Sequence, residues 1–220
     1  EDPEIGVMVG VETFAPKYVT ELAASDFLMT QLIFENEKGV VLPKIQGAIT
    51  KLLLADGSVN SLSWTKLMEL ARDPEVQFAT ISGGEFAKPI NPVLIKDMEE
   101  GTINSDPAKW TAFALERFKA GLKFAMVSCT NFSGNGHYTA ATLKTVAKTW
   151  EEKGFAPKGF IEYLSDPNHF SFPNCMIDRI AVPPDEQTAK IMEKLGIKSN
   201  IVVTEKARYW AVEDIFPAGR

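Results

Sequence analysis

The fold of the chain is decided by residues 123–150, which read KFAMVSCTNFSGNGHYTAATLKTVAKTW. Residues 124–129 are apolar or small, which predicts a strand buried on both faces. A polar loop follows at 130–136, and apolar residues then recur at helical spacing at Leu143, Val146, Ala147 and Trp150. The stretch therefore predicts a strand, a loop and a crossover helix that packs back on a parallel sheet.

Asn131 stands in the loop at the expected carboxyl end of this strand, where open parallel sheets bind small ligands. Its amide donates hydrogen bonds without carrying charge, which suits holding a substrate oxygen that is partly negative. Asparagine and glycine after a strand are also ordinary turn residues, and the pattern alone leaves that alternative open. Asn131 is the candidate catalytic residue of the chain.

The composition is that of a globular protein. The 220 residues are 45% hydrophobic and 24% charged, which suffices for a full core in one domain or one and a half. A net charge of −6 without clustered Lys and Arg argues against nucleic acid as a partner and leaves a small ligand or a protein. No apolar run approaches the roughly 20 residues of a membrane helix, and the acidic start EDPEIG is no signal peptide. We therefore expect a cytoplasmic protein without a membrane partner.

The few cysteines and histidines favour neither a disulfide framework nor a metal site. Cys129 and Cys175 are the only cysteines, one at a strand end and one in an expected loop, so we expect reduced thiols. The two histidines, His137 and His169, lie far apart in the sequence without the spacing of metal ligands.

Two strand ends before residue 123 carry candidate cofactor-binding residues. The apolar run at residues 5–12 ends in Glu12, in the place where a dinucleotide fold has an acid for the ribose hydroxyls; a solvated turn is the alternative. The strand expected at 76–81 runs into Ser82, Gly83 and Gly84, and the glycines would let a flat ligand approach the backbone. A plain turn would use the same residues.

The other elements follow from local patterns. Residues 27–34 and 40–54 predict an antiparallel pair of strands joined by a hairpin connection. Ser63 and Asp106 are each expected to cap a helix, with Pro107 in the first turn of the second helix. Short helices are expected at 93–98 and 157–164, a helix led by Asp185 is expected to end at Gly196, and one or two strands are expected near the end of the chain.

Asp178 and Arg179 lie side by side among apolar residues. Strand alternation would place them on opposite sides, with one facing inwards. A carboxylate at Asp178 can accept hydrogen bonds from a polyhydroxylated ligand, or make a structural contact with an arginine or the backbone. The sequence leaves both readings open.

Three motifs occur in order along the chain: SCTNFSGNGH at 128–137, SFPNCMIDRI at 171–180 and WAVEDIFPAGR at 210–220. With them the chain resembles the polyol-specific long-chain dehydrogenases and reductases, which include mannitol 2-dehydrogenase and fructuronate (mannonate) oxidoreductase. Their pattern reads SCDNLPxNG, SFPNSMVDRI and WVVEDxFPxGRP. The earlier segments IGVMVGVE, FLMTQL and ATISGGEF also match, so the resemblance covers nearly all of the chain.

The resemblance implies the fold. It implies an α/β fold, an incomplete Rossmann-like NAD-binding domain with a mostly parallel sheet and an antiparallel hairpin. This domain would span residues 1–208, without its first strand and glycine-rich turn. Residues 209–220 would lead toward a helical C-terminal domain that is absent here.

The resemblance also implies the chemistry. Hydride would move, without a metal, between the nicotinamide of NAD and a secondary alcohol of a sugar alcohol or sugar acid, with a lysine as general base. Asn131 matches the asparagine that holds the oxyanion, and Ile177 and Asp178 match the pair that contacts substrate. Glu12 favours NAD over NADP because a carboxylate repels the extra phosphate.

The chain also departs from this pattern. Thr130 replaces an aspartate, and Phe132, Ser133 and Gly134 replace leucine, proline and histidine, while Glu85 is displaced from the glutamate of the family's TEGGY loop. The glycine-rich turn expected before Ile5 and the lysine motif expected after Arg220 are missing. We therefore expect an internal piece of a longer enzyme that oxidises no polyol alone, since the proton transfer lacks its base.

Two other functions compete with this interpretation. A hydrolase would use Ser133 as nucleophile with His137 or His169 as base, but its elbow requires GxSxG and the chain reads NFSGN. A non-catalytic module that binds a sugar or a nucleotide remains open because the base is missing.

Overall fold

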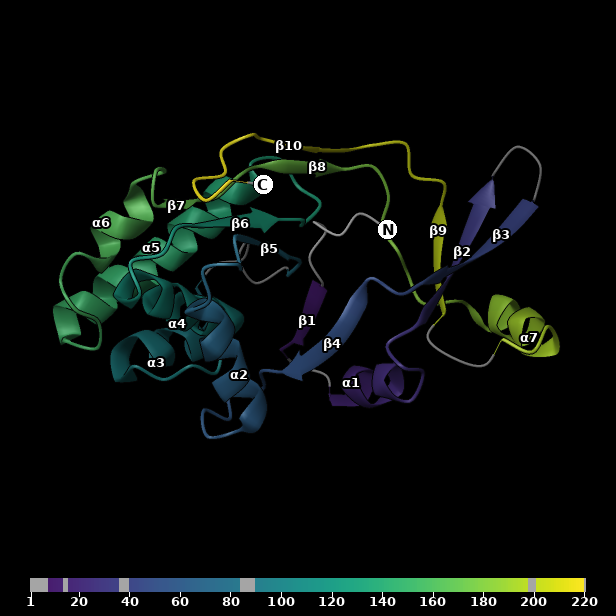
Figure 1. Cartoon of the computed structure of the whole chain (residues 1–220), viewed down its shortest axis with the longest axis horizontal. Helices are drawn as coiled ribbons and strands as arrows, with labels where there is room; N and C mark the ends of the chain where they lie inside the picture. Colours follow the sequence, from purple (N-terminus) through teal and green to yellow (C-terminus); the bar gives the residue numbers. More distant parts are fainter. Residues whose placement is uncertain (1–7, 14–15, 36–39, 84–89, 198–200, 220) are drawn as a thin grey trace. The chain divides into compact units, whose positions relative to one another are not determined.

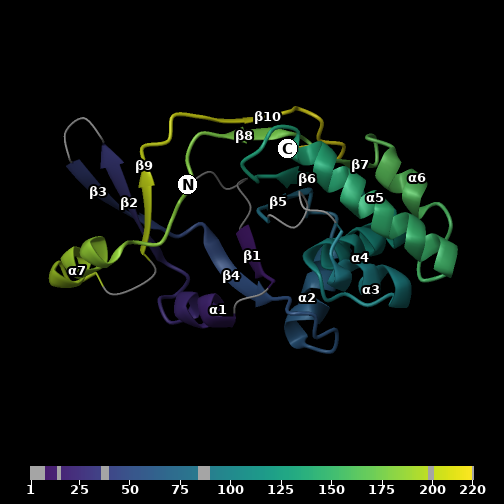
Figure 2. The ribbon, with the colours of Figure 1, turned by 180° about the vertical axis from the view of Figure 1, so that it is seen from behind.

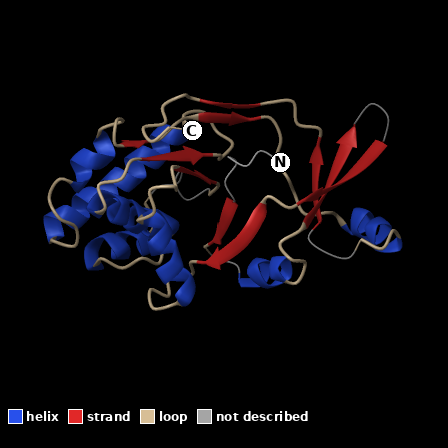
Figure 3. Cartoon of the chain, in the orientation of Figure 1, coloured by secondary structure: helices blue, strands red, loops and turns tan. Residues whose placement is uncertain are grey.

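The computed structural model describes residues 8–13, 16–35, 40–83, 90–197 and 201–219 (Figure 1). The chain forms two compact units, residues 1–56 with 178–209 and residues 57–177 with 210–220. The described segments contain mixed α/β structure with mostly parallel strand pairs, as the sequence predicted (Figure 3). Within these segments, no helix has both the length and the apolar composition needed to cross a membrane.

In its described residues, the first unit holds two small sheets and two helices. Its elements are β1 (Met8–Glu12), α1 (Pro16–Ala23), β2 (Met29–Glu35), β3 (Val40–Gln46), β4 (Ile49–Leu54), α7 (Glu186–Lys194) and β9 (Ile201–Glu205). The expected antiparallel pair is confirmed as β2 and β3, and β9 joins β2 in parallel. The prediction of a single strand at 40–54 is wrong. Gly47 and Ala48 interrupt it, and β4 pairs in parallel with β1 instead.

The second unit is built around a parallel sheet of three strands. Its elements are α2 (Leu62–Ala71), β5 (Phe78–Ile81), α3 (Pro92–Glu100), α4 (Asp106–Lys119), β6 (Phe124–Ser128), α5 (Asn135–Lys153), α6 (Phe160–Ser165), β7 (Phe170–Ser171), β8 (Cys175–Ile177) and β10 (Trp210–Val212). Every residue of β6 is buried between β5 and β7. The apolar face of α5 is buried as well, so the predicted strand, loop and helix are confirmed.

The helix caps differ from two of the predictions. Ser61, and not Ser63, caps α2, because its Oγ accepts the N–H of Trp64 at 3.1 Å. Ser105 caps α4, while Asp106 is already the first helical residue. The cap of α7 at Asp185 is confirmed. The helix predicted at 157–164 begins only at residue 160, because Gly159 before it has a φ of 94°.

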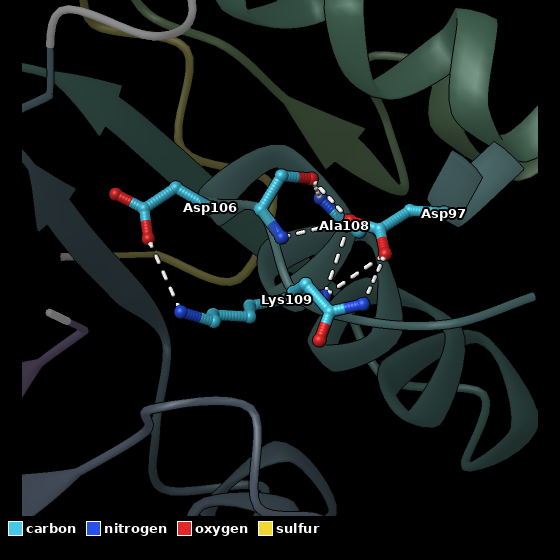
Figure 4. A network of polar contacts seen from close by, with 6 residues as sticks. Asp97, Asp106, Ala108 and Lys109 are labelled. Carbon is cyan, nitrogen blue, oxygen red and sulfur yellow. Dashed lines mark hydrogen bonds and ion pairs between the residues drawn. The ribbon is translucent and has the colours of Figure 1, made fainter. Parts of the chain in front are cut away.

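A buried carboxylate fixes the connection between α3 and α4. Asp97 on α3 has no exposed surface and lies in the network of polar contacts in Figure 4. It accepts hydrogen bonds from Thr102 Oγ1 at 2.7 Å, Ser105 Oγ at 2.6 Å and Ser105 N at 2.7 Å. The backbone and side-chain amides of Asn104 also donate to it. Burial by itself raises the pKa of Asp97, but the hydrogen bonds from Ser105 and Thr102 outweigh it and lower the pKa below its ordinary value.

Candidate functional site

A groove of about 490 Å³ lies in the second unit at the carboxyl end of β6. Its walls are the loop after β6 and the antiparallel ribbon of β8 and β10, whose strands run side by side in Figures 1 and 2. It is lined by Thr130, Asn131, Phe132, Ser133, Gly134, Asn174, Cys175, Met176, Ile177, Ala211, Val212 and Glu213. The groove thus lies at the end of β6, where the sequence predicted a ligand site.

Asn135 holds the two walls of the groove together. Its buried side chain donates from Nδ2 to Thr130 O at 2.9 Å and to Cys175 O at 2.8 Å. Its Oδ1 accepts the N–H of Cys175 at 3.0 Å and the N–H of Gly136 at 2.9 Å. Because one amide satisfies both polar backbone groups of Cys175, it fixes β8 against the loop after β6.

Gly136 allows the start of α5 to approach the chain before β8. A Cβ at this position would lie 2.3 Å from Phe172 O and 2.8 Å from the carbonyl carbon of Pro173. These are backbone atoms, which cannot rotate away. Only glycine therefore permits this packing, and the requirement explains the Asn-Gly pair at 135–136.

Asn174 and Glu213 form the second polar contact of the groove. The Glu213 carboxylate accepts the backbone N–H of Asn174 at 2.8 Å and its side-chain amide at 3.1 Å. Asn174 Oδ1 in turn accepts the N–H of Gly136 at 3.0 Å, at the start of α5. The hydrogen bonds from Asn174, together with the nearby His137, lower the pKa of Glu213 below its ordinary value.

Asn131 is arranged differently from these clamped residues. Its side chain is exposed at the rim of the groove, and within the described segments it has no hydrogen-bond partner. Its neighbour Thr130 is tied down, since Thr130 Oγ1 donates to Gly83 O at 3.2 Å and accepts the N–H of Gly83 at 3.4 Å. A fixed backbone therefore carries a free amide, which can donate hydrogen bonds to a ligand.

The same contact brings two of the predicted loops together. Ser82 and Gly83 follow β5, which pairs in parallel with β6, so both loops leave the same edge of the sheet. Ser82 is exposed and Gly83 is half-buried. Gly84 and the displaced acid Glu85 lie outside the described residues.

The remaining predicted residues belong to different units. Ile177 ends β8, opposite Trp210, and lines the groove. Glu12 ends β1 in the first unit, opposite Leu54, and is half-buried.

Asp178 also belongs to the first unit, where it makes structural contacts. Its Oδ2 accepts the backbone N–H of Arg208 at 2.8 Å, and its Oδ1 lies 3.3 Å from Arg179 Nη1. The alternation that would have placed Asp178 and Arg179 on opposite sides does not hold, because β8 already ends at Ile177.

Sequence reasoning missed four residues that shape the groove: Asn135, Asn174, Cys175 and Glu213. Three of them were visible in the motifs, as the second asparagine of SCTNFSGNG, the asparagine of SFPN and the glutamate of VED. Their pairing was not visible, because it joins positions about forty residues apart.

The geometry does not support a hydrolase triad. Ser133 lines the groove, but the ring of His137 contacts Asn174 at 3.3 Å and that of His169 contacts Asp166 at 2.9 Å. No hydrogen bond joins Ser133 to either ring in the part of the chain that is described. The same part contains no group of three or more His, Cys, Asp or Glu side chains that could hold a metal ion.

Comparison with known proteins gives homologues over most of the chain. D-mannonate oxidoreductase of Thermotoga maritima is 32% identical, over 85% of this chain and 40% of its own length. Mannitol 2-dehydrogenase of Aspergillus fumigatus is 29% identical, over 96% of this chain and 42% of its own length. No family model matches the sequence.

Solved structures agree on the fold. D-sorbitol dehydrogenase in substrate-free form superposes with a TM-score of 0.79 at 22% identity, over 97% of this chain and 45% of that one. The ternary complex of Pseudomonas fluorescens mannitol 2-dehydrogenase with NAD and D-mannitol superposes with a TM-score of 0.73 at 22% sequence identity. The match covers 97% of this chain and 44% of that one. The chain thus spans less than half the length of these relatives. The predicted resemblance is confirmed, since relatives named D-mannonate oxidoreductase and mannitol 2-dehydrogenase match most of this chain.

Proposed function

We propose that the chain is the nucleotide-binding part of an NAD-dependent oxidoreductase. The enzyme would transfer hydride between nicotinamide and a secondary alcohol of a sugar alcohol or sugar acid, of the mannitol/fructose or mannonate/fructuronate type. The observation that carries this proposal is the exposed amide of Asn131, which has no hydrogen-bond partner among the described residues and lies at the carboxyl end of β6, in a chain similar to such oxidoreductases.

The described residues fit a small organic ligand. A groove of about 490 Å³ lies within the range of small-molecule sites, and its polar lining is mostly uncharged. The loops after β5 and β6 lie together at one sheet edge, which is where α/β folds bind nucleotides. We assign cofactor contacts to Glu12 and to the loop of Ser82, Gly83 and Gly84, and substrate contacts to Ile177 and Asp178.

In this proposal Asn131 stabilises the reacting oxygen. Bound NAD would supply the group that accepts or returns the hydride. The Asn131 amide would donate a hydrogen bond to the substrate oxygen as it gains negative charge, which lowers the barrier because the donor is already in place. Thr130 is a positioning residue, because its hydroxyl fixes the loop against Gly83.

The groove contributes no general base of its own. Among the described residues that line it, the ionisable side chains are Cys175 and Glu213, and none is a lysine. The pKa of Glu213 is lowered, so this carboxylate is a weak base at neutral pH. We therefore expect the 220-residue chain to bind its ligands without measurable oxidation of a polyol.

Binding of the two nucleotides tests the cofactor. NADH and NADPH are titrated into the 220-residue chain, and energy transfer from its four tryptophans is followed. We expect saturable binding of NADH, with NADPH weaker by about tenfold because Glu12 repels its phosphate. Glu12→Gln is expected to narrow that difference. A chain that binds neither nucleotide contradicts the proposal.

A second measurement tests the role of Asn131. Binding of D-fructose and D-mannitol to the NAD-loaded chain is measured by saturation-transfer NMR in the wild type, in Asn131→Ala and in the control Asn168→Ala. Asn168 is also exposed, but its amide bonds Asp166 in a turn after α6. The sugar signals are expected to weaken only in Asn131→Ala. If this chain instead produces NADH from mannitol, the expectation that it cannot oxidise a polyol is wrong.

A further inference from the structure

The two cysteines, distant in the sequence, meet beside the groove. Cys129 follows β6 directly and Cys175 opens β8, and their Sγ atoms lie 3.8 Å apart. Both thiols are free and half-buried, and Cys175 lines the groove. The Cys175 thiol donates to Ser128 O at 2.9 Å, which holds its sulfur above the end of β6.

The backbones that carry the two sulfurs are held in place. The Asn135 side chain bonds both the N–H and the C=O of Cys175, and the N–H of Cys129 bonds Ile81 O at 2.7 Å. A disulfide needs the sulfurs to close from 3.8 Å to about 2.05 Å, and the Cys175 sulfur already lies 2.9 Å from the carbonyl oxygen of Ser128, the residue before Cys129. The sequence pattern SFPNSM, which SFPNCM resembles, has serine at this position, so the thiol pair distinguishes this chain from that pattern.

We propose that Cys129 and Cys175 are a redox-sensitive pair, which a peroxide converts into a reversible disulfide at the wall of the groove. This proposal does not depend on the proposed function, because thiol oxidation needs neither nucleotide nor sugar.

The order of the two steps follows from exposure and charge. Burial, then the charge of Cys175 and its hydrogen bond, raises the pKa of the Cys129 thiol to about 12, so Cys129 stays protonated at neutral pH. Cys175 lines the groove and Cys129 is not among its lining residues, so the sulfur of Cys175 reacts first.

In the first step the Cys175 thiolate attacks one oxygen of the peroxide. The O–O bond breaks, the second oxygen leaves as water, and Cys175 becomes a sulfenic acid. The Cys129 sulfur then attacks the Cys175 sulfur, so the S–S bond forms, the S–O bond breaks, and the thiol proton leaves with the hydroxide as water. The two thiols together lose two electrons and the peroxide becomes two waters.

The bond would change the groove. It removes the hydrogen bond from the Cys175 thiol to Ser128 O and draws the start of β8 toward residue 129, two positions before Asn131. Hydrogen exchange in residues 130–134 is therefore expected to change on oxidation and to recover on reduction.

Mass spectrometry of the native 220-residue chain tests the pair. One equivalent of hydrogen peroxide is expected to lower the intact mass by about 2 Da and to remove both free thiols, and dithiothreitol is expected to restore them. Peptide mapping is expected to recover one crosslinked peptide that contains Cys129 and Cys175. Wild type that gains oxygen without a crosslink, keeps both thiols, or forms only disulfide-linked dimers would overturn the proposal.

Two serine variants separate the roles of the sulfurs. In Cys129→Ser the reaction is expected to stop at a sulfenic acid on Cys175, seen as a dimedone adduct. In Cys175→Ser, Cys129 is expected to react at least tenfold more slowly, because its thiolate is scarce at neutral pH. Serine is close to cysteine in size, so both variants are expected to fold. Equal peroxide reactivity of the two variants would refute the assigned order.

Discussion

Two polar clusters of the second unit use similar groups in opposite ways. In the first, the Asp97 carboxylate, labelled in Figure 4, is fully buried. It takes hydrogen bonds from Thr102, Asn104 and Ser105. In the second, the loop of Asn131 is anchored by its neighbours, while the amide of Asn131 is exposed and unbonded within the described segments. The first cluster is complete without a ligand, whereas the second leaves a donor for one.

The difference shows how a rigid site is built around a free donor. Each donor around Asp97 is satisfied inside the protein, so that cluster contributes stability. In the groove, the side chains of Asn135 and Glu213 make the structural hydrogen bonds. The side chain of Asn131 makes no structural hydrogen bond within the described segments. Stability and ligand binding should therefore respond to different substitutions.

The largest expected effect is at Asp97. Asp97→Asn places an NH₂ group against donors such as Ser105 N and Ser105 Oγ, which leaves buried groups unpaired. We expect the free energy of unfolding to fall by about 3 to 5 kcal/mol. Urea denaturation followed by circular dichroism measures it. The matched control is Asp185→Asn at the cap of α7, where asparagine caps as well as aspartate and the loss should stay below about 0.5 kcal/mol. Equal losses in both variants would contradict a special role for Asp97.

The same carboxylate predicts a pH dependence of stability. The pKa of Asp97 is lower in the folded chain than its ordinary value of 3.8, so the unfolded chain binds the proton first. The contribution of Asp97 is therefore complete above pH 3.8 and is lost as the pH falls through the folded pKa. Denaturation between pH 6 and pH 2, repeated with Asp97→Asn, is expected to show a shallower acid decline in the variant.

The sequence was sufficient for elements that are set by local periodicity. The buried strand β6 and the apolar face of α5 were predicted because their residues repeat at fixed spacing within one segment. The caps were misplaced by one or two positions, because Ser61 and Ser63 are equal by residue type. Only the bond from Trp64 N to Ser61 Oγ decides between them.

The long-range contacts could not be predicted in the same way. Nothing local indicated that Asn135 would bond Cys175, or that Glu213 would bond Asn174. The hairpin was found, but the departure of β4 to pair with β1 depends on a partner about forty residues away. The sequence therefore placed Asn131 in its loop, while the residues that fix that loop became visible only in the folded chain.

A pair of asparagine variants sharpens the comparison inside the groove. Asn135→Ala removes a buried amide and leaves the backbone groups of Cys175 without their partner, so we expect a loss of about 2 to 4 kcal/mol in the free energy of unfolding. Asn131→Ala removes an exposed side chain and is expected to change stability by less than about 0.5 kcal/mol. Urea denaturation of both variants measures the difference. If Asn131→Ala lowers the free energy of unfolding as much as Asn135→Ala does, Asn131 is a structural residue, and its proposed role in holding the substrate oxygen is wrong.

The smallest expected effect is the titration of Glu213. Its pKa is lowered chiefly by hydrogen bonds from Asn174 and also by nearby His137, so its carboxylate should protonate at a lower pH than the ordinary glutamate value of 4.5. Its contribution to stability is present above the ordinary value of 4.5 and lost as the pH falls through the folded pKa. Carboxyl ¹³C shifts followed by NMR measure the titration, and Asn174→Ala should move it upward. If Glu213 instead titrates at the ordinary value of 4.5, its contact with Asn174 does not persist in solution, and the groove is less rigid than the Asp97 cluster.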